Sequence, residues 1–260
     1  MSVSERSSTF FPPPYRPDLD GPPLSILDIA KQKLLSVTQD CSPPDPAIHI
    51  QEHLNLLTDS PGYAAFFLTS LERYERLLNA KPVLIQERVA DDPWKLLVAV
   101  TLLNKTSGRS AVPIFWTLIN RWLTPESLAK ADPAELRDHI RPLGLQSIRA
   151  RRLIALSAAY TYSCVYDDDD HDHDHDHTPI SHLPGSGPYA LDSYRIYCGG
   201  PDAWRTVMPR DKELIRFIKW RWAAHGVQWS PTFGVMGPAS ETYIEQLIHE
   251  LVALDPYAPR

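Results

Sequence analysis

Apolar residues recur along most of the chain at the three- and four-residue spacing that one face of an α-helix requires. This pattern predicts helices over 24–37, 61–80, 93–107, 110–123, 147–163, 189–198, 211–226 and 241–254. Two shorter helices are predicted to begin after Thr124 and Asp132, because each of these N-cap residues precedes a proline and, soon after it, a glutamate. No segment alternates apolar and polar residues convincingly, so no strand is predicted. The pattern therefore predicts an all-α fold.

Proline and charge patterns divide the chain into four parts. Many of the 25 prolines lie near the N-terminus, so residues 1–45 are predicted to form a flexible, largely extended arm. A helical N-terminal extension is predicted over 46–80, the main helical domain over 81–235 and a C-terminal helical extension over 236–260. The tract DDDDHDHDHDH interrupts the main domain at 167–177.

This acidic tract dominates the charge balance of the chain. Its seven aspartates contribute −7 to a formal net charge of −6, which leaves +1 for the rest of the chain. Because so much like charge repels itself and cannot be buried, a disordered, solvated insertion is predicted. Alternating His and Asp are also ligand types for a divalent metal, which is the alternative. Between Lys81 and Ser163, twelve Lys and Arg stand against seven Asp and Glu, so a DNA-facing surface is compatible with the acidic average.

Composition also limits the cellular setting that we expect. No run of 18 apolar residues is present, and the first residues lack the apolar core of a secretory signal, so no membrane contact is expected. The three cysteines, Cys41, Cys164 and Cys198, are too few and too scattered for a disulfide framework or a four-thiolate cluster. We therefore expect a reduced, intracellular protein without a metal or other cofactor.

The stretch LPGSG, from Leu183 to Gly187, precedes the predicted helix at 189–198. Glycines at positions 185 and 187 allow a tight turn and bring N–H groups forward without Cβ atoms in the way. Together with the start of a helix, such N–H groups form an anion site that suits a DNA phosphate. Leu183 is expected to anchor the turn in the core. The alternative is a turn that only connects two helices.

Four blocks of sequence, in order, resemble one enzyme family. They are LIQERVADDPWKLLVAVTLLNKTSGRSAVPIFWTL, RPLGLQSIRARRLIALSAAY, GSGPYALDSYRIYC and AWRTVMPRDKELIRFIKWRW, and they cover roughly residues 84–224 apart from the acidic tract. These blocks are similar to the catalytic domain of the methyl-CpG-binding-domain mismatch thymine glycosylases, which belong to the helix-hairpin-helix DNA glycosylase superfamily with endonuclease III and the adenine glycosylase. No methyl-CpG-binding domain is visible in the sequence.

The resemblance implies a two-lobed helix-hairpin-helix fold and a nuclear, monomeric DNA glycosylase of base-excision repair. Its expected substrate is thymine or uracil in G·T or G·U mismatches of double-stranded DNA. Endonuclease III carries four cysteines for an iron–sulfur cluster after its catalytic helix, but no cysteine follows Cys198 here, so no cluster is expected. Two alternatives stay open: a non-catalytic helix-hairpin-helix DNA-binding protein, and a glycosylase with another base specificity, such as adenine or alkylated purines.

The catalytic chemistry requires a carboxylate. Breaking an N-glycosidic bond develops positive charge on the sugar, which a carboxylate beside C1′ stabilises while it orients or deprotonates water. The resemblance places this group at Asp211, whose alternative role is the N-cap of the helix that begins at Lys212. Asp192, inside the preceding predicted helix, is the competing carboxylate and is expected to make structural hydrogen bonds or to face solvent. Bifunctional members of the superfamily carry a nucleophilic lysine where this chain has Tyr189, so a monofunctional enzyme without β-lyase activity is expected.

The resemblance also assigns residues that would bind the base and the duplex. Tyr189 and Gln86 are expected at the base pocket, where an amide suits the polar edge of a pyrimidine. Leu145 is expected to be an exposed wedge that fills the gap left by the flipped base. The second family wedge is an arginine, and this chain has Lys105 instead, which keeps the charge but loses the planar fork. The glycines at 185 and 187 are expected to hold the DNA backbone.

Overall fold

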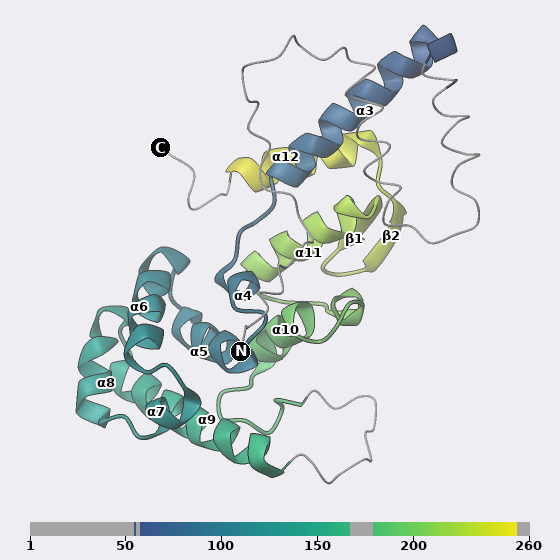
Figure 1. The fold of residues 1–260 in the computed structure, drawn as a ribbon. Helices are drawn as coiled ribbons and strands as arrows, with labels where there is room; N and C mark the ends of the chain where they lie inside the picture. The colour runs from purple at the N-terminus through teal and green to yellow at the C-terminus, as the bar shows by residue number, and fades with distance from the viewer. Residues whose placement is uncertain (1–54, 56–57, 167–178, 254–260) are drawn as a thin grey trace, which may run out of the picture. The chain divides into compact units, whose positions relative to one another are not determined.

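The computed structural model describes residue 55, residues 58–166 and residues 179–253 (Figure 1). The predicted helix at 24–37 and the tract at 167–177 lie outside the described residues. Contacts divide the chain into two compact units, Met1–Ala80 and Lys81–Arg260. No helix in the described ranges is both long and apolar enough to cross a lipid bilayer.

In the first unit the described residues form helix α3 (Pro61–Asn79), as the sequence predicts. Ser60 is its N-cap, and the Ser60 hydroxyl accepts a hydrogen bond from the backbone N–H of Tyr63 at 3.3 Å. Pro61 then occupies the first helical turn, where its missing N–H leaves no intrahelical bond unmade.

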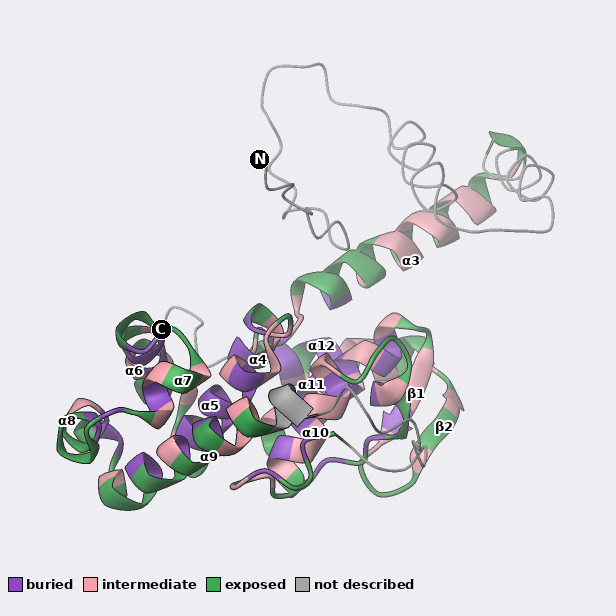
Figure 2. Ribbon diagram, turned by 60° about the horizontal axis from the view of Figure 1, so that its bottom comes forward, coloured by how far each residue is buried: buried purple, intermediate pink, exposed green. Residues whose placement is uncertain are grey.

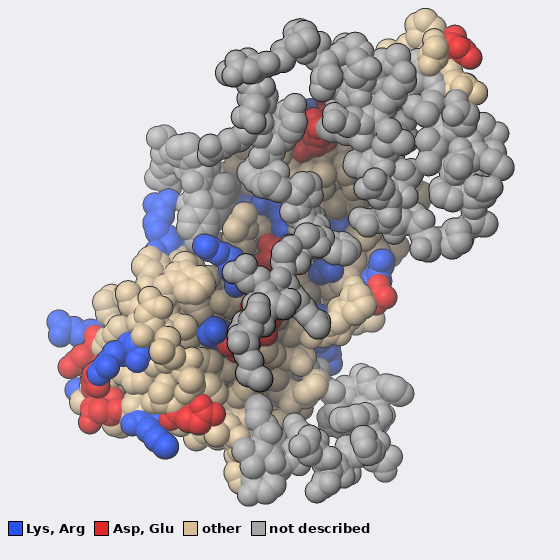
Figure 3. Space-filling model, in the orientation of Figure 1, with Lys and Arg blue, Asp and Glu red and all other residues tan. Residues whose placement is uncertain are grey.

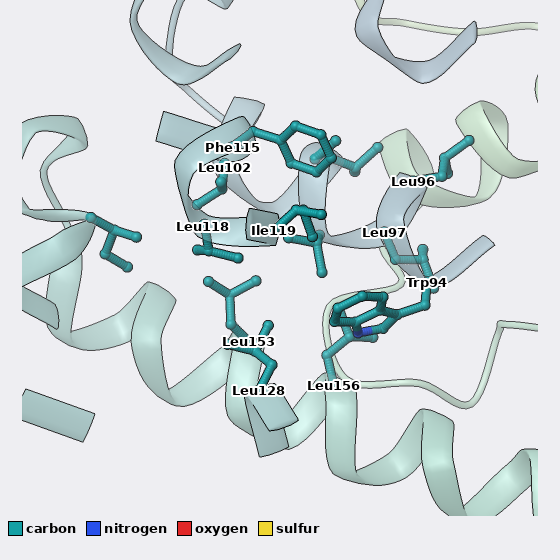
Figure 4. Packing of buried hydrophobic residues seen from close by; sticks show 14 of the residues in the cluster. Trp94, Leu96, Leu97, Leu102, Phe115, Leu118, Ile119, Leu128, Leu153 and Leu156 are labelled. Atoms are coloured by element: carbon teal, nitrogen blue, oxygen red, sulfur yellow. The ribbon is translucent and has the colours of Figure 1, made fainter. Parts of the chain in front are cut away.

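The second unit begins with a group of helices around one apolar core. They are α4 (Ile85–Arg88), α5 (Pro93–Leu103), α6 (Gly108–Arg121), α7 (Pro125–Ala129), α8 (Pro133–His139), the 3-10 turn η1 (Arg141–Leu143) and α9 (Gln146–Tyr166). Helix α5 lies at the centre, with eight of its eleven residues buried, because its sequence is apolar on nearly every side. Figure 4 shows residues of α5, α6, α7 and α9 pointing into this core. The indole N–H of Trp94 donates to the Ser157 hydroxyl at 3.0 Å, which satisfies a polar group buried among the leucines.

The starts of these helices follow their capping side chains. Asp92 accepts a hydrogen bond from the N–H of Lys95 at 3.0 Å and begins α5. Thr124 and Ser127 form a reciprocal capping box at α7, and the Asp132 carboxylate caps α8. Both short helices that the sequence predicts are therefore confirmed.

Helix α5 ends at Leu103, four residues before its predicted end. Asn104 leaves the helical conformation, and Lys105 takes a left-handed one with φ +59°. Ser107 then caps α6, which begins at the next residue. The sequence pattern continued the helix through this loop because Asn104 and Lys105 carry no strong helix-breaking signal.

Six further elements complete the described part of the second unit. They are α10 (Pro188–Tyr197), the 3-10 turn η2 (Ala203–Thr206), α11 (Lys212–Ala224), strands β1 (Val227–Ser230) and β2 (Gly234–Pro238), and α12 (Glu241–Ala253). Figures 1 and 2 show α4 and α10 between α5 on one side and α11 on the other, with buried residues on the facing sides. The core around α5 includes Ala190 of α10, whereas Trp204, Phe217 and Leu247 belong to the buried residues of the second group. This arrangement fits the predicted two lobes.

A small β-hairpin, which the sequence pattern does not predict, follows α11. Its strands, of four and five residues, pair antiparallel as a two-stranded sheet, with an irregular register between Gln228 and Trp229. The irregularity breaks the alternation by which short strands are recognised in a sequence. Since the other regular elements of the described residues are helices, the all-α class is confirmed. The predicted division at 235/236 falls within β2.

Candidate active site

Three elements meet at Tyr189, which lies in the first turn of α10. The amide nitrogen Nε2 of Gln86, from α4, donates a hydrogen bond to the Tyr189 hydroxyl at 2.9 Å. Gln86 is only 2% exposed, so this bond satisfies a buried amide. The two residues are 103 positions apart in the chain, and both are predicted pocket residues that the fold brings into direct contact.

The third element, α11, carries two carboxylates, those of its N-cap Asp211 and of Glu213 in its first turn, whose charges act on the same phenol. Burial is the main reason why the pKa of Tyr189 lies well above its ordinary value, and the negative charge of Asp211 raises it further. Glu213 adds a smaller effect in the same direction, while the hydrogen bond from Gln86 acts in the opposite direction. Tyr189 is therefore a neutral phenol, and Asp211 is near enough for its charge to act on it.

Asp211 is held in place by the helix that it caps. Its Oδ1 accepts hydrogen bonds from the backbone N–H groups of Glu213 at 2.9 Å and Leu214 at 3.1 Å. The predicted N-cap role is thus confirmed. Both bonds go to the same oxygen, which leaves Oδ2 without a hydrogen bond to any of the described residues. A half-buried carboxylate with one fixed and one available oxygen can orient water or stabilise a nearby positive charge.

Asp192, the competing carboxylate, lies in α10 and is also half-buried. Burial raises its pKa, and the neighbouring charge of Arg195 opposes that shift. Among the described residues, the carboxylates whose charge acts on the Tyr189 phenol are Asp211 and Glu213, not Asp192. Of the two predicted candidates, Asp211 is thus the one whose charge acts on the phenol.

The two glycines before α10 have different backbone conformations, and only one of these conformations requires glycine. Gly185 has φ +96°, a conformation that disfavours any Cβ, and an added Cβ would come within 2.9 Å of the Arg152 side chain. Gly187, the N-cap of α10, has an ordinary extended backbone with φ −79°. The turn therefore needs glycine at 185 but not at 187, contrary to the shared role that the sequence suggests. A Cβ on Gly187 would meet no described atom within 4 Å, so the space in front of it is open. Leu183 is 5% exposed and anchors the turn, as predicted.

The two predicted wedge residues share an unusual backbone. Leu145 is 56% exposed with φ +51°, and Lys105 is exposed with φ +59°. Among the described residues they are the two non-glycine positions with positive φ. The predicted exposure of Leu145 is confirmed.

Two further residues lie next to predicted site residues, although the sequence does not predict either of them for the site. Tyr197 lies two turns beyond Tyr189 on α10, and its buried hydroxyl has no hydrogen-bond partner among the described residues. Its pKa is raised first by burial and then by the nearby Glu87 and Tyr189. The second is Arg149, 5% exposed in α9, whose guanidinium contacts the loop of Lys105. A buried arginine inside a basic sequence cannot be told from an exposed one without the fold.

Positively and negatively charged side chains are mixed on the surface over α6–α8. In Figure 3, Lys and Arg side chains over α6–α8 stand beside Asp and Glu side chains. One such pair joins Arg121 Nη2 to Glu135 Oε1 at 2.8 Å. The described residues contain no group of three or more His, Cys, Asp or Glu that could hold a metal ion, and the Asp/His tract at 167–177 lies outside them.

Comparison with known proteins shows which family the chain is similar to. The family model of the HhH-GPD superfamily base excision DNA repair protein matches residues 98–256. A methyl-CpG-binding domain protein 4-like protein of Arabidopsis thaliana is 33% identical over 131 residues, which are 50% of this chain and 26% of the relative. A thymine-DNA glycosylase of Aeropyrum pernix is 32% identical over 129 residues, 49% of this chain and 53% of the relative.

A thymine/uracil-DNA glycosylase of Pyrobaculum aerophilum is 32% identical over 133 residues, covering 51% of this chain and 54% of the relative. The matched part of the chain thus spans about half of the length of two of these relatives and about a quarter of the third. The family match includes Lys105, Leu145, Tyr189 and Asp211 but begins after Gln86.

Proposed function

Because the chain belongs to the HhH-GPD superfamily of base excision DNA repair proteins, we propose that it is a monofunctional DNA glycosylase that removes thymine or uracil from G·T and G·U mismatches. The observation that carries this proposal is the Asp211 carboxylate, which is fixed at the start of α11 and whose charge acts on Tyr189, the partner of Gln86. The names of the relatives from Aeropyrum pernix and Pyrobaculum aerophilum support the choice of base. The substrate is double-stranded DNA, the enzyme acts as a monomer, and its place of action is the nucleus.

The first step is extrusion of the mismatched nucleotide. The start of α10 and the open space at Gly187 receive a backbone phosphate, which supplies sequence-independent grip. Leu145 and Lys105 enter the gap that the extruded base leaves in the duplex. Lys105 contributes charge but not the planar fork of the family arginine, so Leu145 carries most of the filling contact.

The base is recognised by the Gln86–Tyr189 pair. The Gln86 amide uses one N–H for the Tyr189 hydroxyl, which leaves the amide oxygen as an acceptor and the second N–H as a donor. Thymine and uracil offer an N3–H donor between two carbonyl oxygens, which matches this edge. Cytosine has an acceptor at N3, so cytosine held in the same pose would place N3 against the amide oxygen and lose that hydrogen bond, which costs binding free energy. It could pair with the amide only in a shifted pose that brings its N4 amino group to the amide oxygen.

Hydrolysis follows at C1′ of the extruded nucleotide. Asp211 stabilises the positive charge that develops on the sugar and accepts a proton from the attacking water. No amine occupies position 189, and a phenol cannot form the imine that precedes strand cleavage. The products are the free base, which takes up a proton at the nitrogen that left C1′, and an abasic site in an intact strand.

Asp211→Asn tests the mechanism with the fold preserved. Asparagine caps helices as well as aspartate does, so α11 should still form. Loss of the negative charge should lower the single-turnover rate of base release about 100-fold or more, with duplex affinity retained. The measurement is release from labelled G·T, G·U and A·8-oxoG duplexes, each analysed with and without alkali.

Asp192→Asn is the matched control and should keep the wild-type rate. An unchanged rate in Asp211→Asn would remove this residue from the mechanism. Duplex binding without release by the wild-type protein would favour a non-catalytic DNA-binding protein, and release from A·8-oxoG would favour another base specificity. Strand cleavage without alkali would contradict the monofunctional assignment.

A further inference from the structure

Arg149 joins the loops that carry the two wedge residues. It lies in the first turns of α9 and is 5% exposed. Its Nη2 donates to the Asn104 carbonyl oxygen at 2.8 Å and to the Thr106 hydroxyl at 2.6 Å, and its Nη1 donates to the Leu143 carbonyl oxygen at 2.9 Å. One planar guanidinium therefore bonds both loops at once.

These bonds surround the wedge residues themselves. Asn104 and Thr106 are the immediate neighbours of Lys105, one on each side. Leu143 lies two residues before Leu145, and the backbone N–H of Arg149 donates to the Leu145 carbonyl oxygen at 2.9 Å. Side chain and backbone of this one residue thus contact both wedge segments.

Both wedge residues need such support, because their backbones are left-handed. A residue with a Cβ adopts positive φ only where its surroundings hold it there. Lys105 and Leu145 both do so, at φ +59° and +51°. Burial lowers the pKa of the Arg149 guanidinium, yet three oxygen acceptors satisfy its N–H groups, so the charge is accommodated inside the protein.

We propose that Arg149 is a positioning residue for base extrusion: its guanidinium fixes Lys105 and Leu145 relative to each other, so that they enter the duplex as one rigid wedge. Arg149 itself touches neither the base nor the sugar. The inference rests on the proposed function for the roles of Lys105 and Leu145. Base extrusion can nevertheless be measured without any cleavage of the glycosidic bond.

Arg149→Lys is the central variant, because an ammonium group keeps the charge but cannot bridge the three acceptors in one plane. Thr106→Val is the second variant, since it removes one of the three bonds and nearly preserves shape. Ser157→Ala is the control on the same helix: it leaves the buried Trp94 indole without its acceptor and lowers Tm, but it touches neither loop.

The readout is the fluorescence of 2-aminopurine placed next to a G·T mismatch, which rises when the adjacent base leaves the stack. Single-turnover release of thymine and affinity for a fully paired duplex are measured alongside. In Arg149→Lys the extrusion signal and the release rate should fall about 10- to 100-fold, because small misplacements of positioning groups are that costly. Affinity for the paired duplex should stay within about twofold, because the phosphate contacts do not change.

Thr106→Val should show a smaller loss of extrusion, and Ser157→Ala should keep the wild-type extrusion signal despite its lower Tm. Normal extrusion in folded Arg149→Lys, or in Thr106→Val if the first variant does not fold, would overturn the proposal. An equal loss in Ser157→Ala would also overturn it, since the effect would then follow from stability.

The two proposals can fail separately. The wild-type protein could extrude the base, with extrusion impaired in Arg149→Lys, and yet release no base. That result would contradict the proposed glycosylase and leave this inference standing. A wild-type protein that releases thymine while Arg149→Lys extrudes normally would do the reverse. A wild-type protein that neither extrudes nor releases the base would overturn both.

Discussion

At Tyr189 the surroundings that bury the phenol also keep it protonated. Burial and the negative charge of Asp211 both raise its pKa, so the hydroxyl is neutral at physiological pH. A neutral phenol can accept the hydrogen bond from Gln86 and still donate one of its own. This combination suits a residue that lies against a base, because it leaves no charge to desolvate in the pocket.

The contact between Gln86 and Tyr189 should be measurable as a coupling free energy. Tyr189→Phe leaves the buried Gln86 amide without its acceptor and should cost about 1–3 kcal/mol of unfolding free energy. The double variant Gln86→Leu/Tyr189→Phe removes both partners and should recover part of that loss, with a coupling of at least about 0.5 kcal/mol. Urea unfolding of the two single variants and the double variant measures this value, and additive effects would show that the bond contributes nothing to stability.

At the scale of elements, the site is made from helix ends. Asp211 begins α11, Gly187 begins α10, and Gln86 lies in the single turn of α4. Helix starts present N–H groups that no intrahelical carbonyl can use, and these groups bind capping carboxylates or external anions. At α11 they hold Asp211, whereas the capping residue of α10 has no side chain.

The two glycines of the LPGSG turn should respond differently to alanine. Gly185→Ala forces a Cβ into a left-handed backbone and against the Arg152 side chain, so it should lower stability by about 1–2 kcal/mol. Gly187→Ala adds a methyl group to open space on an ordinary backbone, so Tm should hardly change. Its affinity for duplex DNA should fall, because the methyl group enters the space assigned to a phosphate.

Thermal melts and duplex binding in low salt test this pair. Equal loss of Tm in both variants would contradict the different roles of the two glycines. Unchanged DNA affinity in Gly187→Ala would argue against a phosphate at the start of α10.

At the scale of the whole molecule, α12 belongs to the compact unit that begins at Lys81. Arg216 of α11 is 6% exposed, and its Nη2 donates to the Leu251 carbonyl oxygen at 2.9 Å. A second contact joins Lys219 to Glu250 at 3.0 Å. The helix therefore supplies a hydrogen-bond acceptor to a buried arginine on the same element that carries Asp211.

Truncation after Ala239 should destabilise the Lys81–Arg260 unit. It exposes the apolar contacts of three buried residues of α12 and leaves Arg216 without its carbonyl partner. Burial of one large apolar side chain contributes about 1.5–3 kcal/mol, so the loss should be several kcal/mol. Truncation after Ala253 is the control and should keep the wild-type Tm. Equal Tm values for both truncations would make residues 240–253 a dispensable extension.

The helices and the family could be predicted from the sequence, because both depend on local patterns of residues. Helical periodicity and N-caps such as Asp132 act within a few residues, so they can be found in the sequence alone. The stop of α5 at Leu103 and the β1–β2 hairpin were not predictable in the same way. The α5 stop depends on a left-handed residue, in a loop that Arg149 of α9 contacts. The hairpin has an irregular register and is contacted by Tyr243 of α12.

Sequence by itself determined which residue types are available for chemistry: a carboxylate at 211, a phenol rather than an amine at 189, and no cysteine after Cys198. Only the tertiary structure decided which of them act together. It placed Gln86 against Tyr189 across 103 residues, and it buried Arg149 between two loops where its charge must be met by oxygen atoms. Hydrogen bonds and burial depend on distance in space, and distance in space is fixed by packing and not by position along the chain.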